Sequence, residues 1–371
     1  MSLRDLAASF MLPNVPPEWP PGTDVSAFLT YAATDGVVGL LYARLHASGV
    51  LSQLPNALVE GLRAGAYRQA GTEMAQRLEL QRLVAAMYSS GLNGLLMKGA
   101  SLAYGVYSDP AWRVRSDVDL FIRAADRDAV RALLQQLGYV SVDALSGELA
   151  ISQFHCERVA TLGIRHLCDV HWKIVNRLRL ADAVQFNELA AGAIPLPMLG
   201  PGARGLGHVH ALWLACVHRA AHHYDQDTLL WVYDVHLLVE TLDAAGLGRL
   251  VALAERTGVR RICLRALRLA QARFGTQIPA AVITALEAAP ADEPSTVFLN
   301  SRMRQIDVVR DDLRALPGWR ARLALLTEHL LPDAAYMRRS YAPGSSAPVA
   351  WLYLRRILAG ARKWLSSIRQ A

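Results

Sequence analysis

The amino-acid sequence predicts an α+β fold in which a small unit of strands and short helices lies between two helical regions. Three observations lead to this prediction. Residues 25–90 have the spacing of amphipathic helices, residues 91–180 contain short apolar runs bounded by glycine and aspartate, and helical spacing returns after residue 180. The length of 371 residues indicates two domains, or one domain with a large appendage. We expect an N-terminal arm and helices over 1–90, an α+β core over 91–180 and a C-terminal helical domain over 181–371.

The N-terminal region begins with an irregular arm, because residues 12–23 include five prolines. Residues 31–48 have a helical pattern, and residues 51–55 interrupt it. The segment 56–89 is predicted to form one long helix. Within it Leu80, Leu83, Val84 and Met87 share one face, and Gly91 marks its end.

In the core, the sequence predicts short strands that alternate with short helices. Strands are expected over 94–97, 118–122 and 139–142, with helices over 101–107 and 126–137. Gly138 is a suitable residue to end the second helix. Residues 148–159 and 164–174 predict a pair of strands around a turn at 161–163. This unit alone combines strand ends, glycines and carboxylates, so we expect the chemistry here.

The C-terminal region predicts packed antiparallel helices over 206–223, 228–244, 250–257, 260–274 and 280–288. Residues 340–348 form a loop rich in glycine, serine and proline, and 349–367 form a last basic helix. Such a helix with tryptophans can lie on an anionic membrane. More often it docks on its own domain with its arginines in solvent. Membrane association is therefore a possibility that we do not favour.

Composition describes a chain with ample material for a core, since 53% of residues are hydrophobic and 19% are charged. No apolar run reaches the roughly 18 residues of a membrane-spanning helix. The N-terminus has no convincing secretory cleavage site, and we expect a cytoplasmic protein. Cys156, Cys168, Cys216 and Cys263 are widely spaced, which favours buried free thiols over a zinc or redox motif.

The net charge is +7, and 36 of the 39 basic residues are arginine. A GC-rich genome would produce this skew without a functional meaning. We expect the charge to be spread along the chain, so that a nucleic-acid partner is unlikely. The three lysines are Lys98, Lys173 and Lys363.

The strongest chemical signal is Asp117 and Asp119, which lie two apart on a predicted strand. Alternation places both carboxylates on one face while Val118 and Leu120 point into the core. Adjacent carboxylates repel each other, and Mg²⁺ is a natural compensating ion that also binds phosphate. Upstream, Gly99 lies between a strand and a helix, where backbone N–H groups can approach a phosphate. The alternative is an exposed edge strand and an ordinary turn, because Asp-x-Asp alone is common.

Further motifs follow in a fixed order along the chain. They are Leu96-Met97-Lys98-Gly99-Ala100, Tyr107-Ser108-Asp109-Pro110, Arg113, Asp117-Val118-Asp119-Leu120, Leu137-Gly138-Tyr139, Asp169-Val170-His171-Trp172, His218 and His222 with Trp231 and Asp234, Leu331-Pro332, Tyr341, and Tyr353-Leu354-Arg355-Arg356. As an ordered set they resemble the polymerase-beta-like nucleotidyltransferase superfamily. More closely, they are similar to an uncharacterised bacterial branch with a Leu-Lys-Gly signature. The resemblance covers most of residues 92–356, and it implies a small polymerase-beta-like sheet with helices.

The resemblance implies that Asp117 and Asp119 bridge Mg²⁺ (or Mn²⁺), with a third carboxylate on a neighbouring strand. That residue is Asp169, which would also serve as general base. A strand-end aspartate with a structural role is the alternative. The superfamily usually has Gly-Ser or Gly-Gly after the first strand, whereas this chain has Gly99-Ala100. Which donor meets the triphosphate therefore stays open.

Phosphate ligands are expected from Lys98, Gly99 and Ser101. Arg113 and Arg115 share a face in this prediction and could clamp phosphates, although two solvated arginines are the alternative. His171 should share a face with Asp169 and could orient a phosphate or a metal-bound water. A buried structural histidine is equally consistent with the pattern, and a lysine at a strand end can simply extend its ammonium group to solvent.

His218 and His222 lie four apart and so share one face of a helix. Zinc proteases use this spacing, but no glutamate follows the first histidine, so the metalloprotease motif fails. We expect a polar patch of the helical domain that faces the active cleft, together with Asp234.

These observations predict a Mg²⁺-dependent transfer of a nucleoside monophosphate from an NTP to a hydroxyl or phosphate of a small molecule or peptide. Two alternatives stay open. One is a catalytically silent relative that acts as a binding or scaffold protein. The other is a peripheral membrane module built on the C-terminal helix.

Overall fold

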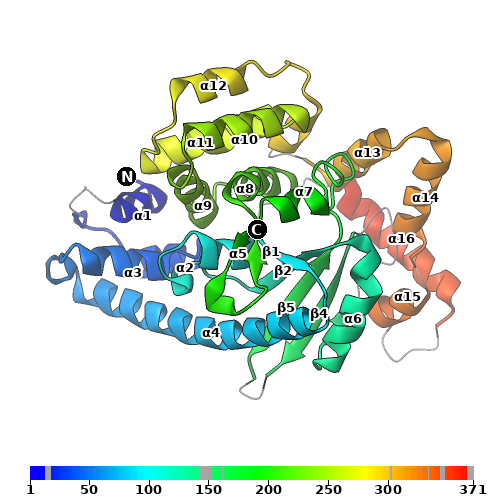
Figure 1. Ribbon diagram of the computed structural model, residues 1–371, viewed down its shortest axis with the longest axis horizontal. Helices are drawn as coiled ribbons and strands as arrows, with labels where there is room; N and C mark the ends of the chain where they lie inside the picture. The colour runs from blue at the N-terminus through cyan, green and yellow to red at the C-terminus, as the bar shows by residue number, and fades with distance from the viewer. Residues whose placement is uncertain are drawn as a thin grey trace.

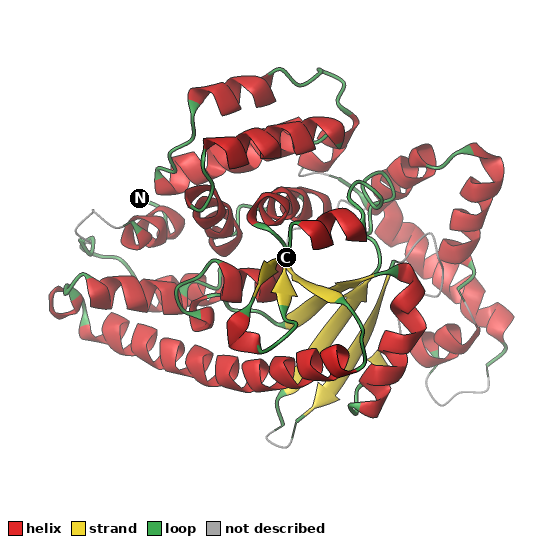
Figure 2. Ribbon diagram, in the orientation of Figure 1, coloured by secondary structure: helices red, strands yellow, loops and turns green. Residues whose placement is uncertain are grey.

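The computed structural model describes residues 1–12, 18–142, 152–160, 163–300, 303–332, 334–342 and 347–365. In this part of the chain one mixed sheet of seven strands is surrounded by helices (Figure 2). The predicted α+β class is therefore confirmed, with helices on both sides of a small sheet.

The sheet is built mostly from the predicted core. Its strands are β1 (Gly94–Met97), β2 (Asp117–Ile122), β3 (Val140–Val142), β4 (Gln153–Val159), β5 (Arg165–His171), β6 (Ile194–Pro195) and β7 (Arg204–Gly205). Their order across the sheet is β3-β4-β5-β2-β1-β7-β6. Strand β2 pairs antiparallel with β1 and parallel with β5. Because β2 has a partner on each side, the direction of its side chains is fixed by both ladders.

Sixteen α-helices in the described part of the chain surround the sheet (Figure 1). They are α1 (Leu3–Met11), α2 (Val25–Thr34), α3 (Val38–Ala47), α4 (Asn56–Ser89), α5 (Lys98–Gly105), α6 (Arg127–Gln136), α7 (Phe186–Ala191), α8 (His208–His223), α9 (Leu229–Glu240), α10 (Ala244–Arg256), α11 (Arg260–Phe274), α12 (Ala280–Glu287), α13 (Gln305–Ala315), α14 (Gly318–Leu330), α15 (Ala334–Tyr341) and α16 (Val349–Leu365). Figure 1 shows α4 along the lower edge, α8 to α12 above the sheet, and α13 to α16 on the right.

Alternation along β2 separates two hydrophobic cores. Leu120 and Ile122 point to the face covered by α4 and α6, where they join a core with Leu83 and Val130. Phe121 points to the opposite face and belongs to the larger core with α8 and α9. Asp117 and Asp119 lie on the same face as Phe121. The two carboxylates are therefore directed toward the helical region rather than toward α4.

The predicted long helix and the strand at 94–97 are confirmed with their bounds. The prediction of one helical segment over 31–48 is wrong, because the chain turns between α2 and α3, whose axes differ by 116°. Gly36 has φ +73° in this turn. A Cβ at Gly36 would lie 2.9 Å from a methyl of Val114 and 3.0 Å from one of Leu230. Glycine is needed here for both its conformation and its size.

Several elements after residue 180 were not predicted, namely α7, β6, β7 and α13 to α15. Strand β7 pairs with β1, so the sheet continues past residue 180, although the three-part division itself stays a prediction. Some predictions lie outside the described residues: 13–17 of the arm, 148–151 of the strand, 161–162 of the turn, 343–346 of the loop and 366–367 of the last helix.

The positive charge is not spread along the chain, so this expectation is wrong. Residues 303–371 carry twelve basic and five acidic side chains, an excess of seven that equals the net charge of the whole protein. Helices α13 to α16 lie in this segment. The rest of the chain is electrically balanced.

Among the described residues, no single helix is long and apolar enough to cross a membrane. Helices α2 and α3 meet that test of length and composition only as a pair, across their bend.

Candidate active site

The predicted carboxylates are brought together by the pairing of β2 with β5. Asp117 and Asp119 are the first and third residues of β2, and Asp119 is the register partner of Asp169 on β5. In a parallel pair, register partners direct their side chains to the same face of the sheet. Three acidic side chains from two adjacent strands therefore meet at one place.

The most compact group of donor atoms differs from the predicted trio. Ligand atoms of Asp119, Asp169 and His171 all lie within 4.8 Å of one another. Asp117 lies outside this group, two residues before Asp119 on β2. His171 is buried, and its Nδ1 has no hydrogen-bond partner among the described residues. The structure thus adds a histidine to the pair of carboxylates.

Two cationic or donor side chains hold Asp119. Lys98 Nζ lies 2.6 Å from Asp119 Oδ1, and His171 Nε2 lies 2.9 Å from the same oxygen. Burial alone would raise the pKa of Asp119, but Lys98 and His171 lower it to about 2. Burial, followed by repulsion from Asp119 and Asp169, raises the pKa of Asp117 to about 6. The site therefore carries unequal carboxylates, with Asp117 the least well compensated.

Lys98 reaches Asp119 from a strained turn between β1 and α5. Its φ is +47°, which is uncommon for a residue with a Cβ and costs about 1 kcal/mol or more. The next residue, Gly99, packs closely, because a Cβ there would lie 3.2 Å from Cβ of Arg115. The turn therefore places the ammonium group of Lys98 beside the carboxylates, and Gly99 lines the same cavity.

Ser101 is not brought to this cavity. Its side chain is buried, and its Oγ accepts a hydrogen bond of 3.1 Å from the backbone N–H of Leu206. The hydroxyl therefore attaches α5 to the segment after β7. A phosphate role for Ser101 is not retained.

The two predicted phosphate clamps are bound to carboxylates instead. Arg113 donates through Nε and Nη2 to the two oxygens of Asp234, both at 2.7 Å, and Tyr107 donates to Asp234 as well. Arg115 Nη1 lies 2.5 Å from Oε2 of Glu73. All of these charged groups are largely buried, so both arginines are structural ion pairs. The two arginines extend to different helices, Arg113 to α9 and Arg115 to α4. Residues 113–116 precede β2, so their side chains do not follow the alternation of the strand.

A chain of polar side chains behind Asp169 was not predicted. His155 Nδ1 lies 2.6 Å from Asp169 Oδ1, and His155 Nε2 lies 2.9 Å from Gln153 Nε2. Asn176 donates in turn to Gln153 Oε1 at 2.5 Å. The hydrogen bond to Asp169 raises the pKa of His155. A signal was present, since residues 155 and 169 are both seven positions from residue 162, the centre of the predicted hairpin turn.

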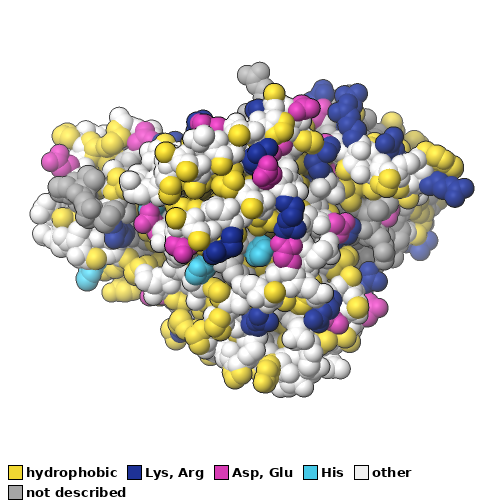
Figure 3. Space-filling view, turned by 45° about the horizontal axis from the view of Figure 1, so that its top comes forward, with side chains coloured by type: hydrophobic (Ala, Val, Ile, Leu, Met, Phe, Trp, Pro, Cys, Tyr) yellow, Lys and Arg dark blue, Asp and Glu magenta, His cyan; other side chains and the backbone are white. Residues whose placement is uncertain are grey.

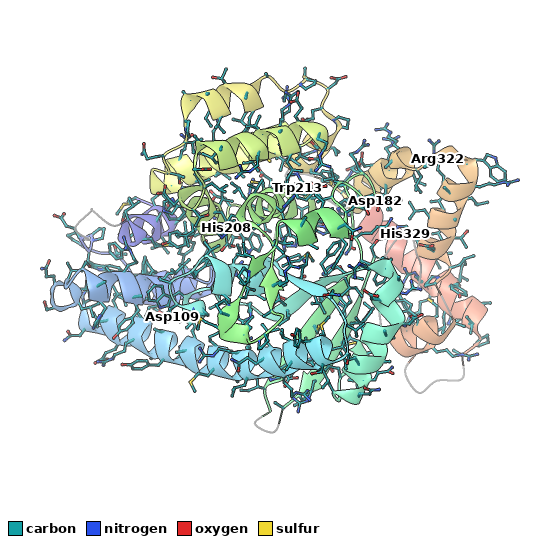
Figure 4. The ribbon with its side chains drawn as sticks, in the orientation of Figure 1. Asp109, Asp182, His208, Trp213, Arg322 and His329 are labelled. Atoms are coloured by element: carbon teal, nitrogen blue, oxygen red, sulfur yellow. The ribbon has the colours of Figure 1, made fainter. Side chains whose placement is uncertain are left out.

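The carboxylates line a cavity of about 780 Å³ between the sheet and the helical region. Lys98, Asp117, Asp119 and Asp169 lie on the sheet side. His218, His222 and Asp234 line it from α8 and α9, together with His223 and Trp231. Helix α8 is held in place by Trp213, labelled in Figure 4, whose Nε1 donates to Thr257 Oγ1 at 2.9 Å.

The donor set fits a hard divalent cation. Asp119 and Asp169 offer adjacent carboxylates, and Asp117 adds a third that is poorly compensated by protein groups. Oxygen donors of this kind suit Mg²⁺ or Mn²⁺. Lys98 occupies only one oxygen of Asp119 by hydrogen bonding, so the other remains a candidate ligand.

Carboxylates from two adjacent strands beside a strand–glycine–helix turn are compatible with the site of a nucleotidyltransferase. The chain belongs to the family described as "Uncharacterised nucleotidyltransferase", whose model matches residues 21–275, more than half of the chain. The match runs from the residues before α2 to the end of α11, so it includes both walls of the cavity. No curated protein matches this sequence. The predicted resemblance to nucleotidyltransferases is confirmed, and the bacterial branch stays a prediction.

Proposed function

We propose that the protein transfers a nucleoside monophosphate from an NTP to a hydroxyl or phosphate group in a metal-dependent reaction. The single observation that carries this proposal is the meeting of Asp117, Asp119 and Asp169 on one face of β2 and β5, beside the turn at Lys98 and Gly99. Membership of a nucleotidyltransferase family supports the reaction class.

The three aspartates, the turn at Lys98 and Gly99, and His155 each have a part in the proposed reaction. Asp117, Asp119 and Asp169 would hold Mg²⁺ or Mn²⁺, which when bound would neutralise phosphate charge and orient the α-phosphate. Lys98 supplies a positive charge, and the backbone at Gly99 allows close approach of phosphate. Asp169, held by His155, is placed to accept the proton of an attacking hydroxyl. The bond from the acceptor oxygen to the α-phosphorus forms, the bond to the bridging oxygen breaks, and pyrophosphate leaves.

The acceptor is proposed to be a small molecule or a peptide. Among the described residues that line the cavity, Lys98, Arg113, Arg115 and Arg219 are each paired with a carboxylate. A nucleic-acid backbone would require a row of available cations. The cavity offers polar groups of both signs instead, which suits a compact acceptor.

The experiment is a transfer assay with the four α-³²P-labelled NTPs, cell extract as the source of acceptor, and Mg²⁺ or Mn²⁺. Label should appear in an acceptor with the wild type and should be lost with Asp119→Asn and Asp169→Asn. Asp182→Asn is the matched control, because Asp182 pairs with Lys173 on the surface and lies outside the cavity. Transfer that survives both cavity substitutions contradicts the proposed site.

A catalytically silent binding protein is the alternative that this assay separates from the enzyme. Isothermal titration would then show binding of Mg·NTP without any transferred label. The cellular location stays a proposal: the four cysteines are free and buried, which suits the reducing cytoplasm.

A further inference from the structure

We infer that His218, His222, His223 and Trp231 form the wall that holds the nucleoside part of the NTP, so that these residues select the base. This inference rests on the proposed function and adds a subsite to it. The wall lies on α8 and α9 and lines the same cavity as the carboxylates, on its opposite side. We call these four residues the imidazole–indole wall.

The four side chains of the wall are in contact through their rings. The rings of His218 and His222 are stacked with centroids 5.1 Å apart, and His218 and His223 are 4.7 Å apart. His223 in turn lies 4.1 Å from the ring of Trp231. A planar heterocycle can stack on such a surface, since base stacking on aromatic side chains is a common mode of recognition.

The polar atoms of the wall are available to a ligand. In the described parts of the chain, the three imidazoles have ring contacts with one another and with Trp231 but make no side-chain hydrogen bond. All four residues line the cavity and keep part of their surface accessible, and none of their ring nitrogens is among the buried unpaired atoms of the described residues. Neutral imidazole offers one donor and one acceptor, which matches the edge of a nucleobase.

The wall is suited to an uncharged group and not to phosphate. Burial, with help from the charge of Lys98, lowers the pKa of His223 to about 4, and burial lowers those of His218 and His222 well below their ordinary value. These shifts favour the neutral form of the three imidazoles. The phosphates belong at the opposite wall, with Lys98 and the carboxylates, which leaves the nucleoside for this one.

Metal binding by these histidines has less support than contact with the nucleoside. Within the part of the chain that the structure describes, the compact group of metal donors is Asp119, Asp169 and His171, and none of the wall histidines belongs to it.

The test compares two probes, Mg·NTP and Mg·tripolyphosphate, by isothermal titration on the full-length protein. Trp231→Ala and His222→Ala should weaken NTP binding about tenfold or more, as loss of one stacking contact does. Both variants should bind tripolyphosphate within about twofold of the wild type. His46→Ala, an exposed histidine on α3, is the matched control and should bind both probes like the wild type.

The outcomes separate the wall from the function on which it rests. Equal loss of both probes, or no loss of NTP binding, overturns the wall. Retained tripolyphosphate binding also shows that a variant is folded. A wild type that binds neither probe contradicts the proposed function itself.

A different observation carries a second inference: contrary to the expectation from the sequence, we propose that α14 and α16 dock on an anionic phospholipid surface. On α14, Trp319 and Leu323 lie on one face and are 68% and 54% exposed. On α16, Trp351 and Leu354 are 55% and 47% exposed. Both pairs have helical spacing, so each helix presents an apolar stripe to solvent.

The charge of this segment matches an acidic surface. The whole net charge of the protein resides in residues 303–371. The guanidinium of Arg320 lies 5.5 Å from the ring centroid of Trp319, and Arg322 lies nearby on α14 (Figure 4). Figure 3 shows basic side chains next to hydrophobic ones at the right-hand end of the molecule. Basic residues flanking exposed tryptophan and leucine favour a membrane interface over nucleic acid.

Vesicle flotation with the full-length protein tests this surface. The wild type should float with vesicles of phosphatidylcholine and phosphatidylglycerol and stay unbound with phosphatidylcholine alone. Trp319→Ser with Leu323→Ser should reduce recovery, as should Arg320→Glu with Arg322→Glu. The matched control is Met74→Ser with Leu78→Ser, which removes two similarly exposed apolar side chains from α4. Equal recovery of the α14 variants, or binding to RNA without flotation, overturns the inference.

Discussion

His155 Nδ1 lies 2.6 Å from Asp169 Oδ1, and the two residues are cross-strand partners on β4 and β5. His155 is thus a positioning residue for the third carboxylate. We expect His155→Ala to lower the rate of transfer about 10- to 100-fold, the range typical of removing a group that orients a metal ligand. The measurement is kcat together with the affinity for Mn²⁺.

Gln153→Ala is the graded comparison, because Gln153 contacts His155 and is one step further from Asp169. Its effect should be smaller than that of His155→Ala, with the melting temperature of both variants close to that of the wild type. If Gln153→Ala lowered the rate of transfer more than His155→Ala does, Gln153 would not act on Asp169 through His155.

Lys98→Met should destabilise the metal-free protein by on the order of 3 kcal/mol, because it removes the cation next to the buried Asp119. Added Mg²⁺ should then raise the melting temperature of the variant more than that of the wild type, since an ion can replace the missing charge. Thermal unfolding in EDTA and in Mg²⁺ measures both effects.

Lys173→Met is the matched control for Lys98→Met. Lys173 pairs with the exposed Asp182, and such surface pairs contribute about 0–1 kcal/mol. An equal response of the two variants to Mg²⁺ would show that Lys98 does not compete with a cation at Asp119.

Asp234→Asn should lower the free energy of unfolding by about 3–5 kcal/mol, because it leaves the buried guanidinium of Arg113 without its carboxylate. Urea denaturation measures this change. Glu188→Gln breaks an exposed pair with Arg256 and should cost less than about 1 kcal/mol. If Asp234→Asn is equally harmless, Arg113 is available for another role, such as the phosphate clamp that the structure argues against.

The contribution of His223 to the stability of the folded protein should fall as the pH decreases from 6.5 toward 4. The pKa of His223 is about 4 in the folded state, because burial and Lys98 disfavour its charged form. In the unfolded chain histidine titrates near 6.5, so in this interval the unfolded state binds more protons. His223→Gln should flatten the dependence of the unfolding free energy on pH. Denaturation curves at pH 7, 6 and 5 test this, and an unchanged slope would contradict it.

Local sequence patterns predicted the strands and turns of the site better than they predicted which distant residues these elements contact. Alternation placed Asp117 and Asp119 on one face, and the strand–glycine–helix turn placed Lys98 nearby, because both depend on adjacent residues. The pairing of Asp119 with Asp169 joins positions 50 residues apart, so only the resemblance indicated it. The long helix at 56–89 was predicted because Leu80, Leu83, Val84 and Met87 have helical spacing and no proline interrupts the segment.

The contacts that were not predicted have a common physical cause, which is that they join distant segments. Arg113 and Arg115 are directed by Asp234 and Glu73, and neither partner is near them in sequence. Ser101 is directed by the backbone of Leu206, next to a two-residue strand too short to predict. The bend at Gly36 depends on how closely Val114 and Leu230 approach it.

The ion pair between Arg113 and Asp234 also limits how the protein can move. Arg113 belongs to the segment that leads into β2, and Asp234 lies on α9, so the pair joins the floor of the cavity to its roof. If the helical region swung away from the sheet at this point, the buried charges of Arg113 and Asp234 would be separated and exposed to solvent. Their attraction is strongest when they are buried, so this movement is unfavourable. Substrates are therefore expected to enter a cavity of nearly fixed width, and selection among them would depend on a shape that exists before they bind.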